Sequence, residues 1–229
     1  MKLFRPLVCF TTSRKVTHCL TIVAIGLLIC LNLGADSIPI NNASFETPAL
    51  ASNGFTTGSI PGWAVSGATG VGVWRPPGSF FATIPDGLNV GWASQENITQ
   101  TLSDTYLEDA TYTLTAWIGQ YYNNGGSGDI YTIELMAGDA VLASFSEATM
   151  TITPGTFVER TVTFTPDASS SAIGQPIEIG LLNPGFLEAD FDRISLTETP
   201  GVPEPGSAIL LFAGLGIVAA RKYWGATQA

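Results

Sequence analysis

Apolar and polar residues alternate along several short segments in the middle of the chain. In residues 111–118, Tyr, Leu, Ala and Ile alternate with Thr and Trp, and residues 129–136 and 158–164 repeat this period of two. Successive side chains of a β-strand point to opposite faces, so this period predicts strands with one buried face. Shorter strand candidates are residues 38–45, 89–92, 97–102, 141–145, 177–181 and 194–196. Because turn residues separate these segments and no helical stripe occurs among them, we predict one all-β sandwich domain over residues 36–198.

The composition of this central segment excludes several classes of chemistry. Between Asp36 and Pro200 there are 18 Asp or Glu residues and three Arg, a net charge of 3 − 18 = −15, with no Cys, His or Lys. A Ser-His-Asp or Cys-His nucleophile, a zinc site of His and Cys, and a disulfide framework are therefore excluded. The acidic surface would also repel nucleic acid. Any 18 acids include carboxylate pairs, so such pairs alone do not predict glycan hydrolysis. We therefore predict a domain that is not an enzyme.

The N-terminus has the parts of an export signal. Four cations within the first 15 residues precede an apolar run from Leu20 to Leu33, and Gly34-Ala35 follows. This order is typical of a secretory signal peptide, here residues 1–35. The alternative is an uncleaved membrane anchor, because Leu33 is large for its place before the cleavage site. The run is short for a membrane span of about 20 residues, which favours cleavage and export.

The C-terminus has the parts of a membrane segment. Residues 199–206 form a Pro- and Gly-containing linker, and residues 207–229 contain an uncharged apolar run that ends at the cations Arg221 and Lys222. Pro203 and Pro205 keep the backbone extended, and Ser207 suits a helix cap. An uncharged helix of this kind partitions into a bilayer, and the cations behind it stay on the cytoplasmic side. We therefore predict a C-terminal transmembrane helix with a basic tail.

This tail resembles a known sorting signal. Pro203-Glu204-Pro205, the hydrophobic helix and the basic Arg221-Lys222 are similar to the PEP-CTERM signal of Gram-negative bacteria. The resemblance implies recognition by an exosortase, transient anchoring in the inner membrane, removal of the tail, and delivery to the cell surface or secretion. The alternative is a plain C-terminal anchor.

The domain resembles galactose-binding-like jelly rolls, the fold of many carbohydrate-binding modules. The resemblance lies in six short motifs: Asn42–Glu46, Pro61-Gly62-Trp63, Pro85-Asp86-Gly87, Gln100-Thr101-Leu102, Tyr112-Thr113-Leu114 and Asp190–Leu196. It implies about eight strands in two antiparallel sheets, and a structural Ca²⁺ that joins the first and last strands. Glu46 and Asp192 match that pattern, and Ca²⁺ takes oxygen ligands of the kinds that this domain offers. The alternative is that both are solvated acids at strand ends.

Aromatic residues supply candidate sugar-binding faces. Protein sites stack exposed rings on sugars, and the candidates here are Trp117, Tyr121, Tyr122 and Trp74. The alternative for each ring is a place in the core, where large aromatic side chains dominate burial. We therefore expect an exported, non-catalytic surface or biofilm-matrix protein that binds extracellular polysaccharide. A structural or adhesive protein without a sugar site is the alternative, and a glycan-active enzyme is the least favoured.

Overall fold

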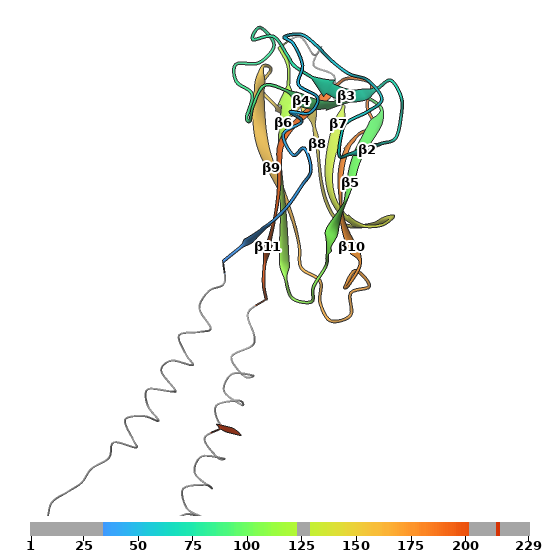
Figure 1. Cartoon of the computed structure of the whole chain (residues 1–229), viewed down its shortest axis with the longest axis vertical. Helices are drawn as coiled ribbons and strands as arrows, with labels where there is room; N and C mark the ends of the chain where they lie inside the picture. Colours follow the sequence, from blue (N-terminus) through green and yellow to red (C-terminus); the bar gives the residue numbers. More distant parts are fainter. Residues whose placement is uncertain (1–33, 123–128, 202–213, 216–229) are drawn as a thin grey trace, which may run out of the picture. The chain divides into compact units, whose positions relative to one another are not determined.

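Two antiparallel β-sheets pack face to face in the computed structural model, which describes residues 34–122, 129–201 and 214–215 (Figure 1). The first sheet has the order β3-β4-β11-β6-β9, and β1 pairs with β11; the second has the order β2-β5-β10-β7-β8. The strands of the first sheet are β1 (Asp36–Ile38), β3 (Val71–Trp74), β4 (Val90–Ala93), β6 (Thr111–Gln120), β9 (Thr156–Phe164) and β11 (Ala189–Thr199). Those of the second are β2 (Ala64–Val65), β5 (Glu96–Thr105), β7 (Ile130–Ala137), β8 (Ala140–Ala148) and β10 (Pro176–Asn183), and η2 (Thr149–Thr151) is a 3₁₀ turn.

The core lies between the sheets and is built from the predicted apolar positions. Leu114 and Ile118 of β6 are fully buried, as are Ile133 of β7 and Phe191 of β11. Because alternate side chains of a strand share a face, the intervening residues of β6 point to the outer side of the first sheet. The prediction of an all-β sandwich is confirmed. The two predicted flanking segments fall almost wholly outside the described residues.

The predicted strand over residues 38–45 is wrong beyond Ile38. Asn42 and Phe45 adopt positive φ angles of 51° and 56°. The Asn42 amide donates to the carbonyls of Thr47 and Pro61 at 2.8 and 3.0 Å, and its oxygen accepts from the Thr47 N–H at 2.9 Å. An Asn side chain that bonds nearby backbone groups favours a turn over a strand. This segment is therefore a loop that Asn42 ties down.

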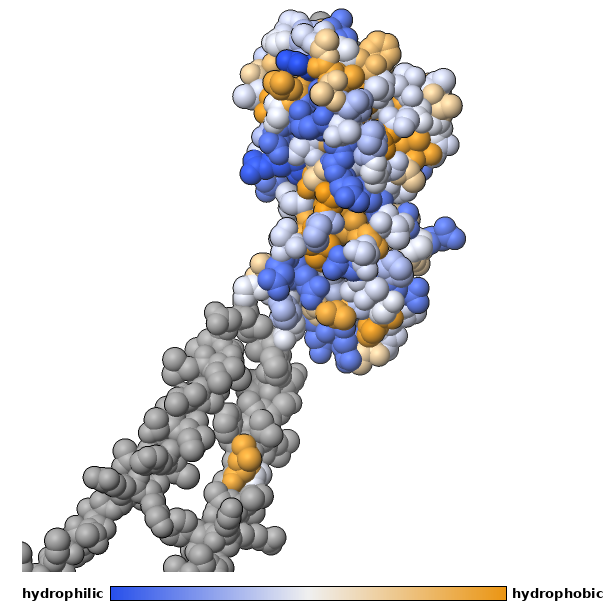
Figure 2. All heavy atoms as spheres, in the orientation of Figure 1, coloured by the Kyte–Doolittle hydropathy of each residue, from blue (hydrophilic) through white to orange (hydrophobic). Residues whose placement is uncertain are grey.

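Two loops are attached to the first sheet around β3. Residues 53–58 run beside β3, where the Thr56 N–H donates to the Val73 carbonyl at 2.8 Å. Residues 75–89 extend toward the opposite edge of the first sheet, where β6 ends and β9 begins. There the Ala82 N–H donates to the Gly155 carbonyl, and the Tyr122 N–H donates to the Phe80 carbonyl. Figure 2 shows apolar side chains on the surface at the upper end of the domain, as well as in its middle and at its lower end. The loops thereby add the side walls of a pocket to the sheet.

The described residues contain no helix with the length and apolar character that a membrane span requires. The predicted transmembrane helix of residues 207–229 lies, except for residues 214–215, outside the described part of the chain.

Candidate active site

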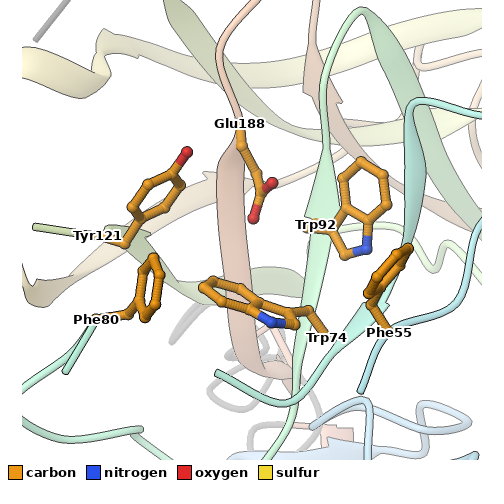
Figure 3. Close-up of a pocket in the computed structure, with 6 residues that line it drawn as sticks. All are labelled: Phe55, Trp74, Phe80, Trp92, Tyr121 and Glu188. Carbon is orange, nitrogen blue, oxygen red and sulfur yellow. The ribbon is translucent and has the colours of Figure 1, made fainter. Parts of the chain in front are cut away.

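A pocket of about 270 Å³ opens on the outer face of the first sheet (Figure 3). Five aromatic side chains and one acid line it: Phe55, Trp74, Phe80, Trp92, Tyr121 and Glu188. Trp74 ends β3, Trp92 lies in β4, Tyr121 follows β6 and Glu188 precedes β11, while Phe55 and Phe80 come from the two loops. The strands therefore form the floor, and the loops form the sides.

The strand register brings a buried acid under this pocket. Asp190 of β11 pairs with Trp92 of β4 on one side and with Gly119 of β6 on the other. Trp92 in turn pairs with Gly72 of β3. Residues directly opposite one another in a ladder project from the same face. Because Phe191 faces the core, its neighbour Asp190 points to the outer face, where the pocket lies.

The two glycines in this row allow other groups to approach the sheet closely. A Cβ on Gly119 would come within 2.5 Å of the Phe157 ring. A Cβ on Gly72 would overlap the backbone carbonyl oxygen of Thr56. Glycine at these positions therefore lets the Phe157 ring and the backbone of residues 53–58 approach the sheet closely.

Three of the aromatic rings support one another. The centroid of Trp74 lies 5.1 Å from that of Phe80 and 5.9 Å from that of Tyr121, and Phe80 and Tyr121 are 5.6 Å apart. All three contacts are edge-to-face, the arrangement that the quadrupoles of aromatic rings favour. One side of the pocket is thus a preorganised aromatic wall.

Glu188 and Asp190 form a coupled acid pair. Asp190 has no exposed surface, and no donor among the described residues bonds to either of its carboxylate oxygens. Burial raises the pKa of Asp190 well above its usual range, and the nearby charge of Glu188 raises that pKa further. Burial also raises the pKa of Glu188. Because two neighbouring carboxylates disfavour each other's charge, the pair favours a state in which one of the two acids is protonated.

Two further polar groups complete the site. Burial, followed by the charges of Glu188 and Asp190, raises the pKa of the Tyr121 phenol, so this hydroxyl stays protonated. The indole Nε1 of Trp92 is buried and has no hydrogen-bond partner among the described residues. Apart from the acid pair, the pocket thus offers uncharged hydrogen-bond donors on apolar walls.

The structure brings together two of the four aromatic residues that the sequence proposed. Trp74 and Tyr121 line the pocket. Trp117 lies elsewhere on the outer face, with the Arg193 guanidinium 6.0 Å from its ring centroid. Tyr122 is half exposed, and its ring covers Gly155. The predicted sorting residues Pro203, Glu204, Pro205, Arg221 and Lys222 lie outside the described residues.

Sequence reasoning missed the acid at the pocket and three of its rings. Glu188, Trp92, Phe55 and Phe80 were not among the proposed ligand-binding or metal-binding residues, and Asp190 was named only as the first residue of the motif Asp190–Leu196. One signal was available for the acids: residues 188, 190 and 192 alternate with the apolar Ala189 and Phe191 in a segment that reads as a strand. No local pattern identified the loop aromatics, because their place depends on tertiary contacts.

The two predicted calcium ligands lie in one acidic region. Glu46 Oε1 accepts hydrogen bonds from the N–H groups of Leu88 and Asn89, both at 2.7 Å. Asp192 is fully buried, so the alternative of a solvated acid is wrong for it, and its Oδ2 accepts from the Asp86 N–H at 2.8 Å. Burial raises the pKa of Asp192 to about 7, and the charges of Asp86 and Glu46 contribute to that rise. The described residues contain no group of three or more His, Cys, Asp or Glu side chains arranged for a metal ion.

Comparison with known proteins identifies the family. Residues 36–197 match the model of the HpiC1-like family, described as HpiC1 cyclase. The chain belongs to the HpiC1-like cyclase family. A comparison with curated proteins finds no match.

Solved structures of cyclases resemble this HpiC1-like domain. A Stig cyclase from Fischerella sp. TAU, in complex with (3Z)-3-(1-methyl-2-pyrrolidinylidene)-3H-indole, is 30% identical with a TM-score of 0.67. The match covers 73% of this chain and 100% of that protein. A cyclase from Fischerella sp. TAU in complex with 4-(1H-indol-3-yl)butan-2-one is 31% identical over 73% of this chain and 99% of that one, with a TM-score of 0.65. An α-L-arabinofuranosidase with 14% identity and a TM-score of 0.50 shares the fold alone.

The family corrects the functional predictions. The identification as a PEP-CTERM protein with a carbohydrate-binding module is wrong, because the matching model is that of a cyclase family and covers residues 36–197, nearly all of the sandwich. The relatives are cyclases with small-molecule ligands. The predictions of a non-catalytic role, of exosortase and polysaccharide partners, and of a structural or adhesive protein are therefore wrong. The physical reason is that one sandwich fold carries unrelated functions. The lack of Cys, His and Lys between Asp36 and Pro200 excludes nucleophiles and bases of those types in the domain, but it does not exclude acid catalysis by buried carboxyls.

Proposed function

We propose that this protein is an acid-dependent cyclase that acts on an indole-containing compound in the pocket of Trp74, Phe80, Tyr121 and Trp92. The observation that carries the proposal is the acid pair Glu188–Asp190, two carboxyls with raised pKa values at an aromatic pocket. An apolar pocket with a few convergent polar groups and carboxyls of raised pKa is the usual form of such an active site. The indole ligands of the Fischerella relatives support the substrate class.

The chemistry assigns a role to each group. Glu188 lines the pocket and is the acid that meets the substrate, while Asp190 lies behind it and shares the proton. Protonation of a substrate carbon–carbon double bond leaves a carbocation on the other carbon. The π electrons of the indole then form the new ring bond, and loss of a ring proton to the carboxylate restores aromaticity and the acid. The product is an isomer of the substrate, so no oxidant or cofactor enters the balance.

The aromatic rings supply the remaining catalysis. The faces of Trp, Tyr and Phe attract a cation through their quadrupoles, most strongly where water is excluded. The edge-to-face contacts hold Trp74, Phe80 and Tyr121 in place before the substrate binds. We therefore assign these side chains, with Trp92, to ligand binding and to stabilising the cation.

Turnover of a set of 3-alkenylindoles, followed by liquid chromatography and mass spectrometry, tests the proposal. We expect a product of unchanged mass and altered retention. Glu188→Gln should lower its rate of formation by about 10²–10⁴-fold, the usual contribution of general acid catalysis. Glu134→Gln is the matched control, because Glu134 lies on β7 in the other sheet. Equal rates for the wild type and Glu188→Gln would overturn the assignment of the acid.

We further propose a structural Ca²⁺ at Glu46 and Asp192, in a sandwich of the galactose-binding-like jelly-roll type. Their carboxylates come from opposite ends of the domain sequence. Burial is the largest cause of the raised pKa of Asp192, and the negative charges of Asp86 and Glu46 raise it further, a repulsion that a cation would relieve. Oxygen ligands of this kind suit Ca²⁺. The ion would supply a link between the opening loop and β11.

Export is a separate proposal, supported by the basic and apolar N-terminal sequence alone. We propose that residues 1–35 direct the chain across the cytoplasmic membrane and are then removed. N-terminal sequencing of the protein from its producer tests this. A mature N-terminus near Asp36 is the expected result, and an intact Met1 would contradict it.

A further inference from the structure

Glu188 lies at the end of a short turn between the two sheets. Residues 184–188 connect β10 of the second sheet to β11 of the first. The acid that meets the substrate is therefore placed by a connecting segment and not by a strand ladder. Connecting segments are more mobile than the strands that they join, so an acid held in one geometry needs contacts that fix this turn.

The side chain of Asn183, the last residue of β10, makes such contacts. Asn183 is fully buried. Its Nδ2 donates to the carbonyl of Leu187, the residue before Glu188. Its Oδ1 accepts a hydrogen bond from the Gly185 N–H at 3.0 Å. One amide thus bonds to the middle of the turn and to the peptide that leads into Glu188.

The same amide fixes the backbone beside Trp92, a second pocket residue. The Nδ2 of Asn183 also donates to the carbonyl of Ala93 at 2.7 Å. Ala93 of β4 pairs with Ala189, where β11 begins. A reversed amide would turn its oxygen toward two carbonyl oxygens, so the hydrogen bonds fix the orientation of this side chain. Asn183 therefore links the backbones next to Trp92 and Glu188, whose side chains lie at one pocket (Figure 3).

The carboxylate of Asp129 holds the turn from another direction. Its Oδ2 accepts a hydrogen bond from the Leu187 N–H. Both backbone polar groups of Leu187 thus bond to side chains, one to Asp129 and the other to Asn183. A Cβ on Gly185 would lie 2.3 Å from the carboxyl carbon of Asp129, so the carboxylate also packs against the turn. The residue before the acid is therefore fixed from two sides.

We propose that Asn183 is a positioning residue for Glu188, assisted by Asp129. The inference rests on the proposed function, because it concerns the acid that this function uses. Asn183 is not among the residues that line the pocket, so it acts through the backbone of Leu187 and not on the substrate. A displacement of about 1 Å at a reacting group can lower a rate by about 100-fold. Loss of these hydrogen bonds should therefore slow the chemical step.

Steady-state kinetics of a double-mutant cycle in the full chain tests this, with a 3-alkenylindole that the wild type cyclises. Asn183→Leu keeps the approximate shape of the side chain and removes its hydrogen bonds. We expect kcat to fall by about 10–100-fold and KM to change by less than about 2-fold. In the Glu188→Gln background the same substitution should leave kcat unchanged, because a residue that acts only through Glu188 then has no acid to position.

Two further variants separate positioning from stability. Gln100→Met in β5 removes another buried amide, which bonds to the backbone N–H and carbonyl of Asn41 at 2.8 and 2.9 Å. It should lower the free energy of unfolding, as Asn183→Leu does, and leave kcat of the folded protein unchanged. Asp129 is only partly buried, so Asp129→Ala should fold even where Asn183→Leu does not. It should lower kcat, and this effect should also vanish in the Glu188→Gln background.

The outcomes separate the inference from the function on which it rests. Wild-type kcat in both Asn183→Leu and Asp129→Ala, with a slow Glu188→Gln, would overturn the positioning role and leave the acid assigned. An equally large loss in the Glu188→Gln background would overturn it too, because Asn183 would then serve the fold and not the acid. If Glu188→Gln had the wild-type rate, the proposed function would be wrong, and the inference would fall with it.

Discussion

Trp92 of β4 and Asp190 of β11 are direct partners across the first sheet, and the polar atoms of both side chains lie buried without a hydrogen-bond partner among the described residues. Leaving a buried polar group unpaired costs about 1–3 kcal/mol. Native structures keep few such groups, and those that persist often have a functional role. Here the Trp92 indole N–H is a donor and Asp190 belongs to an acid pair, and both residues lie at one aromatic pocket.

Trp92→Phe should change the free energy of unfolding by less than Trp63→Phe. The Trp92 indole N–H has no partner among the described residues, whereas the Trp63 Nε1 donates to the Asn42 carbonyl at 3.2 Å. Both changes remove the same atoms, so the difference reports the hydrogen bond, about 1 kcal/mol. Urea unfolding measures it. An equal or greater loss for Trp92→Phe would mean that its N–H has a partner in the folded protein.

Asp190→Asn should stabilise the domain at alkaline pH while it removes activity. The pKa of Asp190 is raised in the folded state, so the wild type binds this proton more strongly when folded. Its stability therefore falls as pH rises above the unfolded pKa of about 3.9. Asn cannot ionise, and the gain over the wild type should grow from pH 4 to pH 8. Parallel stability curves for the two proteins would show that Asp190 is not buried in its charged form.

Added Ca²⁺ should offset the fall in stability with rising pH that Asp192 causes. The pKa of Asp192 is about 7 in the folded state, against about 3.9 unfolded. With a chelator present, stability should fall between about pH 4 and pH 7, by roughly 1.4 kcal/mol for each unit of pKa difference. A bound cation stabilises the charged carboxylate, so added Ca²⁺ should raise the melting temperature at pH 7. Asp192→Asn should remove both effects, and a calcium response that survives in this variant would place the ion elsewhere.

Gly72→Ala should destabilise the domain and widen the pocket. Its Cβ would meet the backbone oxygen of Thr56, which a side-chain rotation cannot relieve. We expect the free energy of unfolding to fall by about 1–3 kcal/mol, as for other overpacked sites. Gly78→Ala is the control, because no atom lies within 4 Å of the Cβ it would add. Equal stability of the two variants would contradict the close contact between residues 53–58 and β3.

The sequence predicted the strands better than the site. Alternation in residues 111–118 identified β6 and its buried Leu114 and Ile118, because burial of one face imposes a period of two. The same rule correctly put Trp117 on the outer face. Alternation could not predict that Phe55 and Phe80 line one pocket, because both lie in loops whose paths are set by long-range backbone hydrogen bonds.

The function was missed for a related reason. Asp190 is unusual through its burial, its pairing with Trp92 and its coupling to Glu188, and none of these is visible in one sequence. The resemblance to carbohydrate-binding modules concerned the fold, and a shared fold does not determine the chemistry of its sites. The family match over residues 36–197 supplied what the residue pattern could not.

Mass spectrometry of the product formed in D₂O tests the central claim most directly. If the Glu188–Asp190 pair protonates a substrate carbon, its exchangeable proton becomes deuterium, and the cyclised product of a 3-alkenylindole should carry one deuterium bound to carbon. Formation of this product should be lost in Glu188→Gln and retained in Glu134→Gln. A cyclised product without deuterium on carbon would contradict proton delivery by this pair.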